Sequence, residues 1–188
     1  MIVRALLVLL ATSILPLPVF AQDSRPQFAP YAGFEQRPIK TLSAQQIDDL
    51  RQGRGMGLAL AAELNGYPGP LHVIELAQGL ELTDLQLLRA RALFDAMKTE
   101  AIPIGERLIT LEMDLDSLFA SRTITPETLS IATAAIGNTN AALRAAHLKY
   151  HLAMLDVLTP PQLQRYSELR GYAGVTDPHA AGGHDRRH

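Results

Sequence analysis

The fold is decided by two copies of one short motif, Leu82-Thr83-Asp84-Leu85-Gln86 and Leu158-Thr159-Pro160-Pro161-Gln162. In each copy the threonine suits a helix N-cap, and the glutamine three residues later supplies the reciprocal partner of a capping box. The leucine before the cap and another leucine five residues further on form a hydrophobic staple. Leu42-Ser43 with Ile47 and Ile124-Thr125 with Leu129 repeat the staple. The sequence therefore predicts four helix starts.

A helical hairpin is predicted between the two motifs. Its first arm runs from 83 to about 120 and carries an apolar stripe of Leu85, Leu88, Ala92, Ala96, Leu108, Leu111, Leu115 and Leu118. Pro103 interrupts this arm and is expected to bend it. Residues 121–124 form the tip, and Pro126 suits the first position of a return arm that ends near 157. A short last helix is expected over 159–170.

The segment before the hairpin is predicted to form shorter helices. A helix begins at Ser43, weakens at Gly53, Gly55 and Gly57, and resumes over 58–64. No strand precedes these glycines and no G-K-[ST] follows, so we interpret them as a bend and not as a phosphate loop. A loop over 65–70 and a short helix over 71–77 follow. The predicted fold class is all-α: a bent antiparallel helical hairpin with short flanking helices, four to five helices in all.

The N-terminus predicts a secretion signal over 1–21. Arg4 gives a positive start, residues 5–15 an apolar stretch, and Val19-Phe20-Ala21 a cleavage site before Gln22. Pro16 and Pro18 interrupt the apolar run before membrane-spanning length, although an uncleaved anchor is an alternative. We expect a periplasmic protein with an extended arm over 22–40, a helical-hairpin domain over 41–172 and a disordered, histidine-containing tail over 173–188.

Composition narrows the classes of function. The chain has 188 residues and no cysteine, so no disulfide and no thiol chemistry is expected. Removal of 1–21 leaves 16 basic and 19 acidic residues, a net charge of −3 that favours no nucleic-acid partner. No G-x-S-x-G, H-E-x-x-H or phosphate-loop motif occurs, and we expect no enzyme activity.

The doubled L-T-x-x-Q motif resembles the Spy/CpxP family of periplasmic chaperones, whose relatives include the metal sensor CnrX and the zinc-binding ZraP. The resemblance covers residues 71–172. It implies a curved antiparallel homodimer that acts as an ATP-independent chaperone or envelope-stress modulator for unfolded or envelope proteins, with a regulatory partner as a further possibility. The alternative architecture is a self-contained four-helix bundle in which the helix at 58–64 covers the hairpin.

Basic and apolar neighbours on the hairpin are the candidate client-binding residues, because charge combined with small apolar patches suits loose, rapid capture. They are Arg89, Arg91, Lys98, Arg107, Leu115, Leu118, Phe119, Arg144 and Lys149. For each of them the alternative is an ordinary solvated charge or a core leucine.

Metal binding is the alternative function, with zinc, copper, nickel or cobalt as the ion. The chaperone function requires no cofactor. His147, His151 and Met154 fall at i, i+4 and i+7 of a helix and share one face. The resembled sensors add ligands from a short helix before L-T-x-x-Q, which implies His72 and Glu75 here. Leu76 stands where a second histidine is expected. Alternatively, His147 and His151 flank the core stripe as packing residues.

The tail carries His179, His184 and His188, which are similar to the histidine-rich zinc-binding tails of ZraP-like proteins but sparser. A flexible segment of this kind binds zinc or copper only weakly, because the ion must order the chain. The alternative is an unstructured polar terminus.

Overall fold

The computed structural model describes residues 30–172, so the predicted signal peptide, the first part of the predicted arm (22–29) and the tail lie outside the described residues. The chain divides into two compact units, Met1–Gly33 and Phe34–His188. The described part of the second unit is all-helical, as predicted. Its elements are η1 (Phe34–Gln36), α1 (Ala44–Arg51), α2 (Leu60–Glu63), α3 (Pro70–Glu75), α4 (Asp84–Ala120), α5 (Pro126–Met154) and α6 (Pro160–Leu169).

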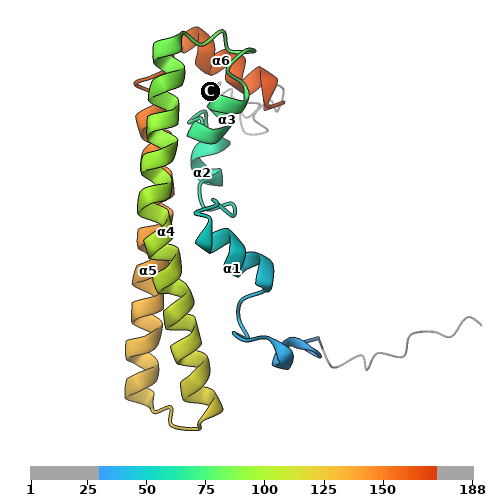
Figure 1. Ribbon diagram of the computed structural model, residues 1–188, viewed down its shortest axis with the longest axis vertical. Helices are drawn as coiled ribbons and strands as arrows, with labels where there is room; N and C mark the ends of the chain where they lie inside the picture. Colours follow the sequence, from blue (N-terminus) through green and yellow to red (C-terminus); the bar gives the residue numbers. More distant parts are fainter. Residues whose placement is uncertain (1–29, 173–188) are drawn as a thin grey trace, which may run out of the picture. The chain divides into compact units, whose positions relative to one another are not determined.

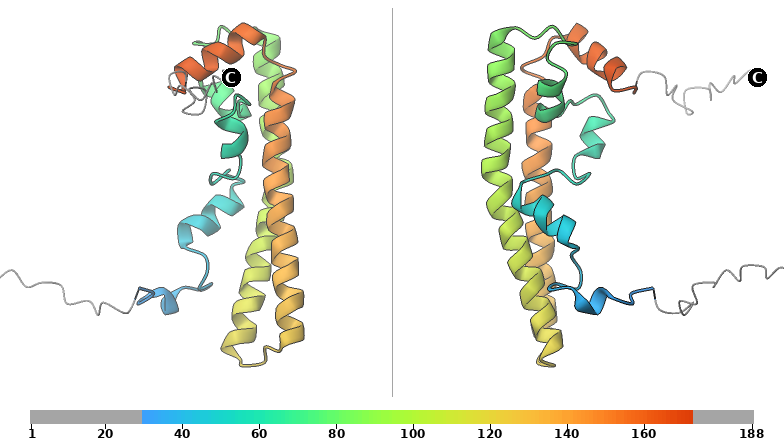
Figure 2. Two further views of the ribbon diagram at one scale, coloured as in Figure 1. Left: turned by 180° about the vertical axis from the view of Figure 1, so that it is seen from behind. Right: turned by 45° about the vertical axis from the view of Figure 1, so that its right-hand side comes forward.

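The predicted hairpin is formed by α4 and α5, which lie antiparallel and side by side over most of their length (Figures 1 and 2). Thr83 and Thr125 cap the two arms through their hydroxyls, as their positions in the sequence predict. Pro103 lies inside α4, and Figure 1 shows the axis of this helix changing direction near its middle. None of the helices described combines the length and apolar character needed to cross a membrane.

One side of the hairpin is covered by the chain that precedes it (Figure 2). α1 packs on α4, α2 on α5, and α3 on both. Six α-helices are present between residues 30 and 172, more than the four to five predicted, because the glycine run separates α1 from α2. This cover agrees in part with the bundle alternative, while the homodimer remains a prediction.

The interior consists of two apolar clusters at different heights along the hairpin. One joins α1 to the middle of the hairpin through Ile39, Leu50, Ala101, Leu108, Ile109 and Leu143. The other joins α3 and α6 to the end of the hairpin away from its tip, through Val73, Leu80, Ala90, Met154, Leu158 and Tyr166. The stretch of hairpin between the two clusters borders a cavity.

Gly105 allows α1 to lie directly against α4. A β-carbon at this position would stand 2.5 Å from the carbonyl oxygen of Leu50, closer than real contacts permit. No larger residue fits there without a shift of the α1 backbone. A helix-interior glycine costs about 1 kcal/mol relative to alanine, and here that cost permits the contact between the two helices.

Two sequence predictions are corrected. The sequence predicts an arm that is extended to residue 40, but Phe34–Gln36 is a 3-10 helix and Ile39 is buried in the first cluster. The apolar stripe predicted for the first arm lies partly on the wrong face, because Leu85 and Leu88 are 57% and 65% exposed. Both faces of this stretch are apolar: Ala90, Leu93 and Met97 face inward, while Ala92 and Ala96 of the predicted stripe are also exposed.

The two glutamines of the repeated motif bond to each other, which capping alone does not require. Gln86 Oε1 accepts the cap N–H of Thr83, while Gln86 Nε2 donates to Gln162 Oε1 (2.8 Å) and to the carbonyl oxygen of Val157 (2.9 Å). Gln162 repeats the pattern. Its Oε1 accepts the N–H of Thr159, and its Nε2 donates to Gln86 Oε1 (3.2 Å) and to the Leu80 carbonyl (3.1 Å). The N-termini of α4 and α6 are thereby joined.

We expect Gln86→Glu to lower the free energy of unfolding by about 2 to 3 kcal/mol, measured by urea denaturation at neutral pH. Glutamate retains the capping oxygen but cannot donate to Gln162 or Val157 when ionised. The matched control is Gln46→Glu. Gln46 is exposed and accepts the cap N–H of Ser43, so the change should stay within about 0.5 kcal/mol. Equal effects of the two substitutions would show that Gln86 acts only as a cap.

Candidate functional site

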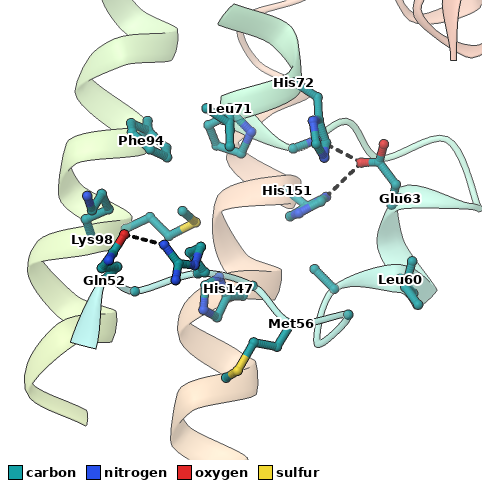
Figure 3. A pocket seen from close by; sticks show the side chains of 18 residues that line it. Gln52, Met56, Leu60, Glu63, Leu71, His72, Phe94, Lys98, His147 and His151 are labelled. Atoms are coloured by element: carbon teal, nitrogen blue, oxygen red, sulfur yellow. Dashed lines mark hydrogen bonds and ion pairs between the residues drawn. The ribbon is translucent and has the colours of Figure 1, made fainter. Parts of the chain in front are cut away.

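A cavity of about 370 Å³ lies between the hairpin and the chain that covers it (Figure 3). α4 contributes Phe94 and Lys98, and α5 contributes His147 and His151. The opposite wall comes from the linker between α1 and α2, from α2 itself and from the start of α3. The lining residues are Gln52, Gly53, Arg54, Gly55, Met56, Gly57, Ala59, Leu60, Glu63, Gly69, Pro70, Leu71, His72, Phe94, Met97, Lys98, His147 and His151.

Glu63 is a buried carboxylate, only 5% exposed, on the wall formed by α2. Its Oε1 accepts hydrogen bonds from the hydroxyls of Tyr166 (2.5 Å) and Tyr172 (3.1 Å) and lies 3.3 Å from Arg170 Nε. Its Oε2 accepts the N–H of Gly69 at 3.2 Å. Glu63 therefore joins α2 to the start of α3, to α6 and to the residues just after α6.

This network explains how a charge is tolerated in the interior. Removal of one partner of such a buried pair costs about 3 to 5 kcal/mol, because the remaining charge is left without compensation. Burial raises the pKa of Tyr166, and the bond to the Glu63 carboxylate raises it further. The phenol therefore remains a hydrogen-bond donor at all physiological pH values.

The orientation of the His151 ring is set by the loop before α3. Its Nδ1 lies 2.7 Å from the carbonyl oxygen of Tyr67 and 3.8 Å from Glu63 Oε2. Because a carbonyl can only accept, Nδ1 carries the proton, and in the neutral ring the lone pair is on Nε2. Nε2 faces Gly69, where a β-carbon would approach it to 3.1 Å.

His147 lies one turn before His151 and is 2% exposed. Its Nε2 is buried and has no hydrogen-bond partner within the described part of the chain. Burial lowers the pKa of His147, and the neighbouring His151 lowers it further. The ring is therefore neutral near pH 7, and its unpaired nitrogen is an exception to the rule that buried polar groups are bonded.

The predicted metal ligands are brought together only in part. His147, His151 and His72 all line the cavity. His72 Nδ1 pairs with Glu75 Oε2 at 3.0 Å, and Met154 is fully buried in the second apolar cluster. Over residues 30–172, no three or more His, Cys, Asp or Glu side chains form a group suited to a metal ion. Sequence reasoning missed Glu63, which was visible only as a single acid within the apolar 58–64 segment.

The candidate client-binding residues are distributed over the hairpin. Arg89, Arg91, Arg107, Arg144 and Phe119 are exposed, and Leu115 and Leu118 are half-buried. Lys149 is exposed and forms an ion pair with Glu100, whereas Lys98 lies on the cavity wall.

Comparisons with known proteins add no relationship. No family model, no curated protein and no solved structure matches this chain. The functional argument therefore depends on its own residues.

We expect the stability of the protein to fall as the pH drops below about 6.5, partly because of His147. Its pKa is lower in the folded state than in the unfolded chain, so the unfolded state binds the proton first. In the His147→Leu variant, urea denaturation between about pH 7.5 and 5 should show a weaker decline. At pH 7.5 the variant should be no less stable, because it removes an unpaired polar atom. An unchanged pH dependence would exclude His147 as a source.

Proposed function

We propose that this protein is a periplasmic, ATP-independent chaperone that holds unfolded proteins on the hairpin formed by α4 and α5. The observation that carries the proposal is the number of large apolar side chains that the hairpin leaves at its surface. Leu85, Leu88 and Leu152 belong to one end, and Met113, Phe119, Leu129 and Ile131 to the half that includes the tip. Exposed apolar side chains in such number favour contact with other proteins.

Positive charge lies beside one of these groups. Arg89 follows Leu88 on α4 and lines a shallow depression together with Ala92, Val157 and the acidic Asp156. An arginine next to exposed leucines suits a surface that attracts unfolded chains through charge and holds them through small apolar contacts. The same apolar surface is available for the homodimer that the family resemblance implies.

Purified protein beginning at Gln22 should suppress the aggregation of a reduced or denatured client, measured by light scattering without ATP. EDTA should leave this activity unchanged. Leu88→Ser combined with Phe119→Ser should reduce it several-fold, because both side chains are more than half exposed on the hairpin.

Leu64→Ser is the matched control, since Leu64 is 59% exposed but lies outside the hairpin. It should retain full activity. Sedimentation of each variant separates loss of client binding from a change in self-association. Inactivity of the unmodified protein toward several unrelated clients would contradict the chaperone function.

Metal binding, as a sensor or in metal resistance, is the second candidate function. It is favoured by the His151 ring, whose Nδ1–H is held by a backbone carbonyl while Nε2 keeps its lone pair. Metal-binding histidines are oriented in the same way. His147, one turn away on the same cavity wall, is the other imidazole that α5 contributes.

Calorimetric titration with zinc or copper tests this function in a chain ending at Gly174, which excludes the three tail histidines. We expect one saturable event, weakened as the pH falls through about 6.5 because imidazoles must be neutral to bind a metal. The double substitution His147→Ala and His151→Ala should abolish it. Absence of binding in the shortened chain would contradict the sensor function.

A further inference from the structure

The cavity between the two apolar clusters has walls suited to a hydrocarbon. Five large apolar side chains line it: Met56, Leu60, Leu71, Phe94 and Met97. Its volume of about 370 Å³ is within the range of small-molecule sites, about 300 to 1,000 Å³. Figure 3 shows Phe94 on α4 and Leu71 on α3 among the side chains that line it.

Glycine keeps this space open. Gly53 and Gly57 have positive φ values of 62° and 80°, which favour glycine at these turns of the linker. Gly55 does not require such a conformation, and a β-carbon there would lie no closer than 3.7 Å to His147. A side chain at Gly55 is therefore compatible with the backbone, and its absence leaves room beside the imidazole.

The charged side chains that line the cavity differ in whether they have an ion-pair partner. Glu63 is the one acidic residue of the lining, and its oxygens are already bonded to Tyr166, Gly69 and Arg170. Arg54 forms ion pairs with Asp48 and Asp49. Lys98 forms no ion pair within residues 30–172, and its Nζ lies 5.8 Å from the centre of the Phe94 ring. The lining thus offers a cation without an anion.

Lys98 and His147 come from adjacent helices and line the same cavity (Figure 3). The Nε2 of His147, unpaired among the described residues, is buried and is not accessible to a ligand. An anionic group bound in the cavity would compensate the charge of Lys98.

We propose that this cavity binds a small apolar monocarboxylate, such as a medium-chain fatty acid. The carboxylate is directed toward Lys98, and the hydrocarbon lies against Leu60, Leu71 and Phe94. Burial of the hydrocarbon provides most of the affinity, at about 0.8 kcal/mol for each methylene group, and the cation selects the charge of the headgroup. This inference does not depend on chaperone activity.

The experiment is calorimetric titration of the protein beginning at Gln22 with decanoate, below its micellar concentration. We expect saturable one-to-one binding, with decyltrimethylammonium at least about tenfold weaker because it places a cation beside Lys98.

Three variants locate the site. Lys98→Gln should weaken decanoate binding by about tenfold, whereas Lys40→Gln, at the other end of the covering chain, should have no effect. Gly55→Leu should fill the cavity and prevent binding, with folding verified by circular dichroism. The proposal is overturned by absence of saturable binding, by equal affinity for the cationic detergent, or by unchanged affinity in Lys98→Gln. A Gly55→Leu variant that folds and binds normally would also overturn it.

Discussion

The bond between Gln86 and Gln162 is the interaction on which the arrangement of the helices depends. Each side chain caps its own helix and donates to a carbonyl just before the other motif, so the hydrogen bonds of each glutamine are complete only when both motifs are present. The two helix starts are 76 residues apart in the sequence. Joining them fixes the end of α5 beside the start of α4, and α6 leaves the end of the hairpin and lies over α3 (Figures 1 and 2). A generic capping signal thus becomes a long-range contact.

Glu63, on the cavity wall formed by α2, also joins segments that are far apart in the sequence. Its oxygens hold Tyr166 of α6, Gly69 before α3 and Arg170 near the end of the described chain. Polar contacts of this kind have defined geometry, whereas the leucine and alanine contacts around them tolerate small displacements. The buried carboxylate therefore fixes the position of one cavity wall more precisely than apolar packing alone would.

Sequence reasoning predicted the helices well because their signals are local. Caps at Ser43, Thr83 and Thr125, the proline at 126 and the glycine break all act over a few residues. The inward face of α4 was harder to predict, since leucines and alanines occur on both of its sides, and only packing against α1, α3 and α5 decides which side is buried. The role of Glu63 was not predictable, because its partners are about 100 residues away.

The same distinction holds for the histidines. Their spacing placed His147 and His151 on one helical surface, as the structure shows them on one cavity wall. It did not indicate that Tyr67 holds one ring and that the other has an unpaired nitrogen, because both facts depend on the loop that covers them.

Gly105 has an effect beyond the helix pair that it joins. With the Leu50 backbone seated against it, α1 cannot slide along α4, since Ala101 and Ile109 on the neighbouring turns present side chains where the glycine presents none. The linker that begins two residues after Leu50 is the edge of the cavity. A glycine that does not line the cavity thus acts as its spacer: it sets the height at which the linker meets Lys98 and His147, and so the length of hydrocarbon that the cavity accommodates.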